Sequence, residues 1–127
     1  MAFRGTYDSV VLEDCKDARL EEVRARRLVI KRSSASVLRS TFTEGIVADT
    51  STLLMTGGGV DGTIAIDAKD SQLDLAGVAI DAKGEACHMT GQTRVVYSVC
   101  PVRTASGLAY RHGFESSAAS APTGALP

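Results

Sequence analysis

The residues with the clearest catalytic potential are a histidine and the carboxylates that recur at comparable places in the chain. His88 stands in a stretch that alternates apolar and polar residues, and Asp49 and Asp67 close two earlier stretches of the same kind. If the apolar members point inward, these side chains and Arg111 fall on outer columns of neighbouring strands. A histidine beside carboxylates is suited to general acid or base catalysis. The same pattern is typical of the solvated side of a half-buried sheet, which we favour, so no catalytic residue is assigned.

A related set of polar residues suggests a binding surface. An outward column that includes Asp67, Asp74, His88 or Arg94 offers charges and hydrogen-bonding groups that would grip a glycan. The pattern does not single out which residues would bind, so the ligand-binding residues stay unknown. A polysaccharide is therefore an alternative partner rather than the first expectation.

One glycine-rich segment matches a nucleotide-binding pattern by its letters alone. Gly57-Gly58-Gly59-Val60-Asp61-Gly62 satisfies G-x-G-x-x-G, and Asp81 follows about 20 residues later. A dinucleotide site needs a helix to begin at this loop, so that its amide groups face the pyrophosphate. Residues 63–67 alternate as a strand instead, so we predict a tight turn in which glycine permits positive φ, and no cofactor.

The three cysteines, Cys15, Cys87 and Cys100, are an odd number without a C-x-x-C pair. This spacing supports neither a disulfide framework nor a zinc ribbon, and we expect no metal site. Buried free thiols are the favoured interpretation. A bridge between Cys87 and Cys100 stays open, because the sequence does not place the two side chains.

A basic segment early in the chain is the feature that would attract an anionic polymer. Glu21 and Glu22 dilute it, and no aromatic residue is interleaved for base stacking. The formal net charge of −1 also argues against a nucleic-acid partner. We therefore predict a solvated charged face made of Arg19, Arg24, Arg26, Arg27, Lys31 and Arg32.

The elements that must position these residues repeat along the chain. Units begin at Gly45, Gly62, Gly84 and Gly107, spaced by 17, 22 and 23 residues, and each contains short stretches with a period of two. Such strands bury their apolar side by stacking in register, which predicts ladders such as Ile64 over Cys87 over Leu108, and Leu53 over Leu73 over Val95. Hydroxyl residues recur at one place in each unit, and we expect them to bond the local backbone: Ser51, Ser71 and Thr93.

The composition agrees with a core made of small ladders. Of 127 residues 44% are apolar, yet aromatics are 5% and tryptophan is absent, while glycine numbers 12. The first third of the chain reads as strands at 9–12, 27–31 and 36–42, with a short helix possible near residues 17–26. We expect one domain at residues 1–114 and a disordered tail rich in Ser, Ala and Pro at 115–127.

The repeats resemble those of short, solitary right-handed parallel β-helix repeat proteins. The resemblance rests on the glycine starts and on the patterns of residues 51–55, 71–80 and 93–97, and covers roughly residues 9–113. Larger members of this architecture are often polysaccharide lyases or hydrolases, but this chain has about half their coils and no recognisable cluster of catalytic acids. The bactofilins, a second family of stacked coils that polymerises end to end, are matched only loosely.

The sequence thus predicts an all-β protein, a right-handed parallel β-helix of about five coils. Because such a stack has unpaired strand edges at both ends, we expect a homo-oligomer or the folded piece of a longer protein. The first functional hypothesis is a non-enzymatic binding or scaffolding module; the alternatives are a carbohydrate-binding or carbohydrate-active protein and a filament. No signal peptide or transmembrane segment is visible in the chain, which leaves a cytoplasmic protein and an envelope domain without its export signal both open.

Overall fold

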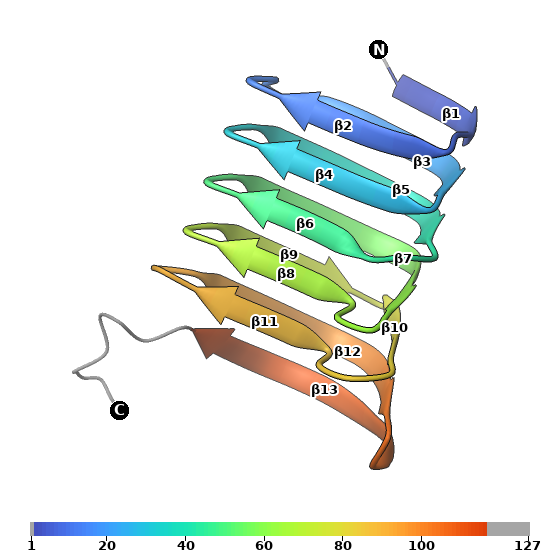
Figure 1. The fold of residues 1–127 in the computed structure, drawn as a ribbon, viewed down its shortest axis with the longest axis vertical. Helices are drawn as coiled ribbons and strands as arrows, with labels where there is room; N and C mark the ends of the chain where they lie inside the picture. Colours follow the sequence, from blue (N-terminus) through green and yellow to red (C-terminus); the bar gives the residue numbers. More distant parts are fainter. Residues whose placement is uncertain (1, 117–127) are drawn as a thin grey trace.

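The protein is a right-handed parallel β-solenoid of about six turns, described here from a computed structural model that covers residues 2–116. As the chain descends in Figure 1, front strands run leftward and the strands behind them run rightward. The described residues form thirteen strands and no helix. The strands are β1 (Ala2–Thr6), β2 (Ser9–Glu13), β3 (Ala18–Ala25), β4 (Arg27–Lys31), β5 (Ser34–Phe42), β6 (Ile46–Asp49), β7 (Thr52–Gly62), β8 (Ile66–Lys69), β9 (Gln72–Ala76), β10 (Ala79–Ala82), β11 (Cys87–Thr90), β12 (Arg94–Thr104) and β13 (Gly107–Ser116).

The strands form two sheets that the chain visits alternately. The smaller sheet has five parallel strands in the order β11-β8-β6-β4-β2. The larger sheet has eight strands in the order β1-β3-β5-β7-β10-β12-β13, and β9 pairs with both β7 and β12. All its pairings are parallel except the last, because β13 runs antiparallel to β12.

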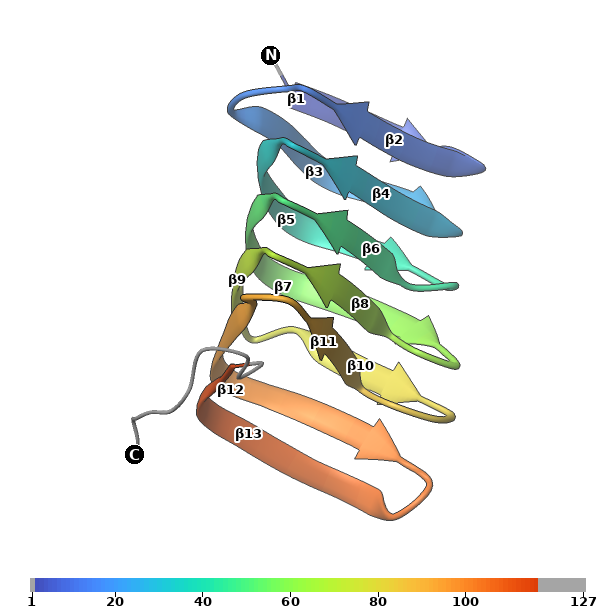
Figure 2. The same cartoon turned by 60° about the vertical axis from the view of Figure 1, so that its left-hand side comes forward.

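Two columns of left-handed residues turn each coil, which gives the coil three sides (Figure 2). One column joins the smaller sheet to the larger one, and its members have positive φ: Asp14, Arg32, Thr50, Asp70 and Gly91. The other bends the larger sheet within its strands, at Glu22, Arg39, Gly57, Gly77 and Val99. A single left-handed residue bends the extended chain without an added loop, so the coils stay short.

A ladder of hydroxyl groups lies inside the first of these corners. The backbone N–H of Ser51 donates to the Ser71 hydroxyl at 3.0 Å, and the Ser51 hydroxyl donates to the Asp49 carbonyl at 2.8 Å. The same pair of bonds recurs on the neighbouring coils at Ser33 and Ser71. Thr93 accepts the N–H of Ser71 and donates its hydroxyl to the Thr90 carbonyl, and at the other end of the ladder Cys15 donates its N–H to the Ser33 hydroxyl. This confirms that the recurring hydroxyls bond the backbone, where each satisfies a buried N–H of the coil before it.

The core is one continuous cluster of inward side chains, stacked in ladders between the sheets. Leu53, Leu73 and Val95 are stacked in register and buried, as the sequence predicted. The expected ladder of Ile64, Cys87 and Leu108 is wrong, because Cys87 pairs with Ile66 and both other residues are exposed. Ile64 lies in a lengthened corner before β8, and Leu108 lies on a strand that runs in the opposite direction.

The helix considered near residues 17–26 is a strand, β3. Its apolar residues Leu20 and Val23 are three apart because the left-handed Glu22 between them shifts the alternation, so both point into the core. The same offset separates Val37 from the buried Ser40 in β5, across Arg39. A corner inside a strand thus imitates a helical spacing.

The end of the chain also differs from expectation. Gly107 does not open another parallel coil; it begins β13, which turns back along β12. The structure has about six turns rather than five, and β13 continues through Glu115 and Ser116. The rest of the predicted tail, 117–127, lies outside the described residues. Among residues 2–116 no helix is long and apolar enough to cross a membrane.

Candidate functional site

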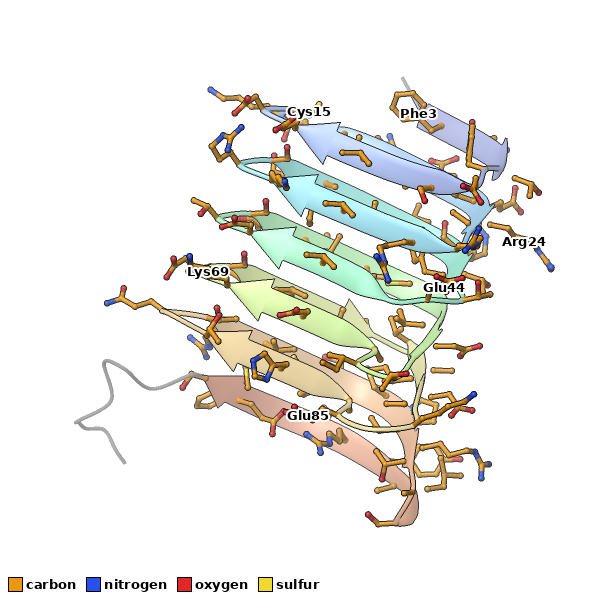
Figure 3. All side chains as sticks on the ribbon, viewed as in Figure 1. Phe3, Cys15, Arg24, Glu44, Lys69 and Glu85 are labelled. Atoms are coloured by element: carbon orange, nitrogen blue, oxygen red, sulfur yellow. The ribbon has the colours of Figure 1, made fainter. Side chains whose placement is uncertain are left out.

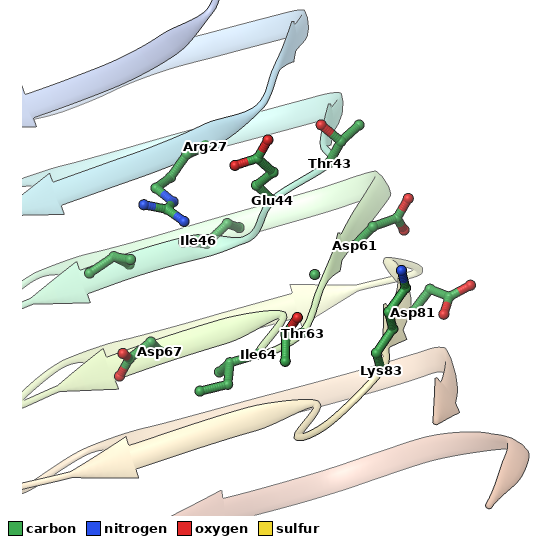
Figure 4. A pocket seen from close by; sticks show the side chains of 12 residues that line it. Arg27, Thr43, Glu44, Ile46, Asp61, Thr63, Ile64, Asp67, Asp81 and Lys83 are labelled. Atoms are coloured by element: carbon green, nitrogen blue, oxygen red, sulfur yellow. The ribbon is translucent and has the colours of Figure 1, made fainter. Parts of the chain in front are cut away.

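A groove lies at the corner between the ends of β7 and β10 and the starts of β6 and β8 (Figure 4). Its volume is about 830 Å³. It exists because the coils lengthen there. Leu28 pairs with Ile46 after 18 residues, whereas Ile46 pairs with Ile66 after 20. The additional residues form the loop at 63–65, which pushes Ile64 outward. The lining residues are Arg27, Thr43, Glu44, Ile46, Val47, Asp61, Gly62, Thr63, Ile64, Asp67, Asp81 and Lys83.

Four carboxylates and two cations give the groove a mixed and mainly acidic lining. Asp61 and Asp81 are register partners on β7 and β10. Partial burial raises the pKa of Asp61, and the neighbouring charge of Asp81 raises it further. Glu44 is held at the rim by Arg26, whose Nε donates to the carboxylate at 2.8 Å. Of these carboxylates, the sequence pattern indicated Asp67 as a candidate binding residue and included Asp61 and Asp81 only in the rejected nucleotide-binding pattern, while Glu44 gave no signal. The longer coil from Ile46 to Ile66 is not visible in the glycine spacing, in which Gly45 to Gly62 is the shortest interval.

The predicted histidine column is assembled only in part. His88 and Asp67 are register partners on β11 and β8, and the His88 Nδ1 atom lies 3.4 Å from a Glu85 carboxylate oxygen. Asp49 is the register partner of Lys69 instead, two residues along the strand from the position opposite Asp67. Arg111 lies on β13 of the other sheet, where it forms an ion pair with Glu115 at 2.7 Å. The expected grouping of His88 with Asp49 and Arg111 is therefore wrong.

The glycan-binding column is divided between the two sheets. Asp67 and His88 belong to the five-stranded sheet, while Asp74 on β9 and Arg94 on β12 belong to the eight-stranded one. Asp74 faces Leu54 and Val96 in register rather than another charge. The structure thus brings together one of the named pairs, and only Asp67 of the four lines the groove.

The basic segment is spread over a corner and two sheets, and most of its arginines already have acidic partners. Arg26 lies between Asp8 at 3.0 Å and Glu44 at 2.8 Å. Arg32 donates to both carboxylate oxygens of Asp14, at 2.7 and 3.1 Å, and this bidentate bond lowers the pKa of Asp14. The side chains of Figure 3 accordingly show cations and acids interleaved along the coils. This agrees with the predicted solvated charged face.

The glycine-rich segment turns inside β7. Gly57 and Gly58 have φ of +69° and +85°, and the chain continues into the strand β8 rather than a helix. A Cβ atom on Gly58 would lie 2.0 Å from the Ser40 carbonyl oxygen, so this position accepts glycine alone. The turn predicted from the sequence is confirmed, although it bends one strand rather than joining two coils.

The cysteines are all free thiols; Cys100 is buried, and Cys15 and Cys87 are partly buried. Burial raises the pKa of Cys87 to about 12, and the charge of Glu115 adds to this effect. Tyr97 lies near it, and burial likewise raises the pKa of the phenol. Within residues 2–116 no group of three or more His, Cys, Asp or Glu side chains is arranged to hold a metal ion.

In comparisons with known proteins, no family model, no curated protein and no solved structure matches the chain.

Proposed function

We propose that this protein is a self-associating, non-enzymatic β-solenoid module that acts as a scaffold by joining copies through its ends. The observation that carries the proposal is the distribution of exposed large apolar side chains over the described surface. Seven of the nine lie on the terminal coils and two on the middle ones. The seven are Phe3, Tyr7 and Val11 near the start and Val99, Leu108, Tyr110 and Phe114 near the end.

Strand edges at the same two ends support the proposal. In the smaller sheet β2 and β11 are the terminal strands, and in the larger sheet β1 and β13 are. A terminal strand presents a row of backbone N–H and C=O groups that another chain can pair with. Apolar side chains beside such an edge add the hydrophobic burial that makes pairing between copies favourable.

The test is the mass of the protein in solution over a range of micromolar concentrations, by sedimentation velocity or light scattering. We expect the mass of a dimer or larger assembly, which falls on dilution. A matched pair of variants separates end contacts from general stickiness. Leu108 on the last strand and Leu54 on a middle strand are 48% and 47% exposed, so Leu108→Lys should weaken association and Leu54→Lys should not. A stable monomer at every concentration would refute self-association.

A glycan-binding function is the second candidate, and the groove is the observation that favours it. Its lining combines the carboxylates of Asp61 and Asp67 with the hydroxyls of Thr43 and Thr63 and the exposed Ile64, which together offer acceptors, donors and an apolar surface to a sugar ring. Titration with acidic and neutral oligosaccharides, read by chemical-shift changes, tests it. We expect shifts at the groove that Asp67→Asn weakens and Asp74→Asn, on the opposite sheet, does not. No shift at millimolar ligand would exclude this candidate.

A further inference from the structure

The last strand, β13, makes a long strand edge at the end of the larger sheet. It follows β12 through a tight hairpin and pairs with it from Thr104 opposite Gly107 to Arg94 opposite Ser116. On its other side β13 has no strand partner among residues 2–116. It has ten residues, whereas the other terminal strands, β1, β2 and β11, have five, five and four. β13 therefore offers more unpaired backbone than any other terminal strand of the described fold.

The inner face of β13 is fixed to the solenoid by polar contacts. Arg111 and Glu115 form an ion pair at 2.7 Å, and Glu115 accepts a hydrogen bond from the Tyr97 hydroxyl at 2.9 Å. The Arg111 guanidinium also lies over the Tyr97 ring, 5.5 Å from its centre. These contacts close the end of the core and hold the strand in place, so its outer edge is presented in a defined position.

The outer face of β13 is exposed and carries three large apolar side chains beside His112 and Ser116. Leu108, Tyr110 and Phe114 alternate along it with exposed fractions of 48%, 70% and 63%. The Arg94 guanidinium stacks on the Phe114 ring at 4.5 Å from its centre, which holds the ring against the sheet. Folded proteins usually protect a long edge with lysine, proline, a bulge or covering chain. β13 contains neither lysine nor proline, and the register shift in its pairing with β12, between Tyr97 and Cys100, places the additional residue on β12 rather than on β13.

We propose that β13 pairs with β13 of a second copy, antiparallel and about a twofold axis, so that the larger sheets of two solenoids become one continuous sheet. This inference rests on the proposed self-association and names its interface. Two identical strands related by a twofold axis run antiparallel and form a closed, self-complementary contact. The alternative, β13 against β1 of the next copy, would pair ten residues with five and leave half of the edge exposed.

Charge and side-chain matching select the register. Centring the pair on Arg111 would set two arginines opposite each other, which is unfavourable. Centring it on His112 pairs the strands from Leu108 to Ser116, keeps the outer faces continuous, and places Tyr110 opposite Phe114 of the second copy. Aromatic cross-strand pairs of this kind stabilise antiparallel sheets. In this register Arg111 faces Gly113 and the two His112 side chains meet at the axis.

The first test compares substitutions at the two ends by sedimentation velocity. A twofold interface contains Tyr110 from both copies, so Tyr110→Lys changes two contacts and should raise the dimer dissociation constant by roughly a hundredfold or more. Phe3→Lys on β1 and Leu54→Lys in the middle should leave the dissociation constant unchanged, with circular dichroism confirming that all three variants fold. If Phe3→Lys disrupts the assembly and Tyr110→Lys does not, the β13 interface is refuted while self-association stands. If the wild type is monomeric, both proposals fail.

The second test uses the fact that only the residue on the axis meets its own copy. Under mild oxidation His112→Cys should form a disulfide-linked dimer, whereas Leu108→Cys, which faces Ser116 across the pair, should not. The wild type, with its own three thiols, measures the background. A His112→Cys variant that stays dimeric but does not cross-link above this background would refute the twofold pairing centred on His112.

Discussion

Asp61 is the groove residue whose ionised form the fold most clearly disfavours. It stands beside Asp81 on the neighbouring strand, and both partial burial and that charge raise its pKa. When the pKa of a carboxyl is higher in the folded than in the unfolded state, its ionisation lowers the free energy of unfolding of the protein. This loss of stability develops as the pH rises through the folded pKa. The groove therefore retains a charge that folding alone does not favour.

We expect Asp61→Asn to raise the melting temperature at pH 7, because it removes an ionised group that the fold disfavours. Below the unfolded pKa the wild-type side chain is neutral in both states, so the difference should vanish near pH 3. Thermal unfolding followed by circular dichroism at several pH values measures it. Asp74→Asn, on an outer face without an acidic register partner, serves as control, and a gain equal to that of Asp61→Asn would contradict this explanation.

Cys87 should react slowly with thiol reagents in the folded protein. Burial raises its pKa from the ordinary thiol value of 9.0 to about 12, which leaves roughly a thousandfold less thiolate at pH 8. Alkylation by iodoacetamide, mapped by mass spectrometry before and after unfolding in urea, tests this. Rapid labelling of Cys87 in the folded chain would show that the thiol is not protected as described.

At the scale of the elements, the corners decide whether the coils stack. One corner is held by the hydroxyl ladder, in which Ser51 receives the N–H of Ser33 at 3.1 Å and donates to the Asp49 carbonyl. The other is held by left-handed residues, and Gly58 there approaches Ser40 of the coil before it. Both corners depend on contacts between coils, so a substitution at either corner should lower the stability of the stack.

Ser51→Ala should destabilise the protein by about 1–3 kcal/mol, because it leaves the buried N–H of Ser33 without its acceptor. Chemical denaturation measures the free energy of unfolding. Thr52→Ala, at the exposed neighbouring position, should cost less than about 0.5 kcal/mol. Equal losses for the two variants would show that the ladder does not contribute to stability.

Gly58→Ala should be far more damaging than Gly77→Ala. The two glycines lie at the bend of the larger sheet on neighbouring coils, but a Cβ on Gly58 would collide with the Ser40 backbone, whereas one on Gly77 meets nothing within 4 Å. Gly77→Ala should cost about 1–2 kcal/mol for the left-handed conformation alone. Melting temperatures of the two variants provide the comparison, and a Gly58→Ala variant as stable as Gly77→Ala would contradict the close packing.

On the scale of the whole molecule, each coil contacts only the coils above and below it. A middle strand such as β5 pairs with β3 and β7, whereas β2 pairs with β4 alone. The stability of such a stack is approximately the sum of terms between neighbouring coils, so the ends open more readily than the middle.

Amide hydrogen exchange should therefore be slowest in the middle strands β5 and β7 and faster in β1 and β2. Mass spectrometry of exchanged peptides measures this gradient. At the other end, the proposed pairing of β13 predicts that its exchange slows as the protein concentration rises. Uniform protection from β2 to β8 would contradict the independent fraying of the ends.

The sequence by itself determined the class of fold and much of the packing. Buried residues two positions apart, such as Leu73 and Leu75, identify a strand because a period of two is a local property of an extended chain. Recurring hydroxyls such as Ser71 likewise mark a shared turn, because their bonds to the nearby backbone are local. The composition, without tryptophan and with many small apolar residues, agrees with the ladders that form the core.

Only the tertiary structure decided the phase and direction of individual strands. A left-handed Glu22 shifts the inward positions of β3, and two further residues at one coil open the groove beside Ile64. Side-chain alternation is also the same in parallel and antiparallel strands, so nothing local distinguishes β13 from another coil. That choice depends on Arg111 and Glu115 meeting Tyr97 across the hairpin, and these are contacts between residues that are not neighbours in the sequence.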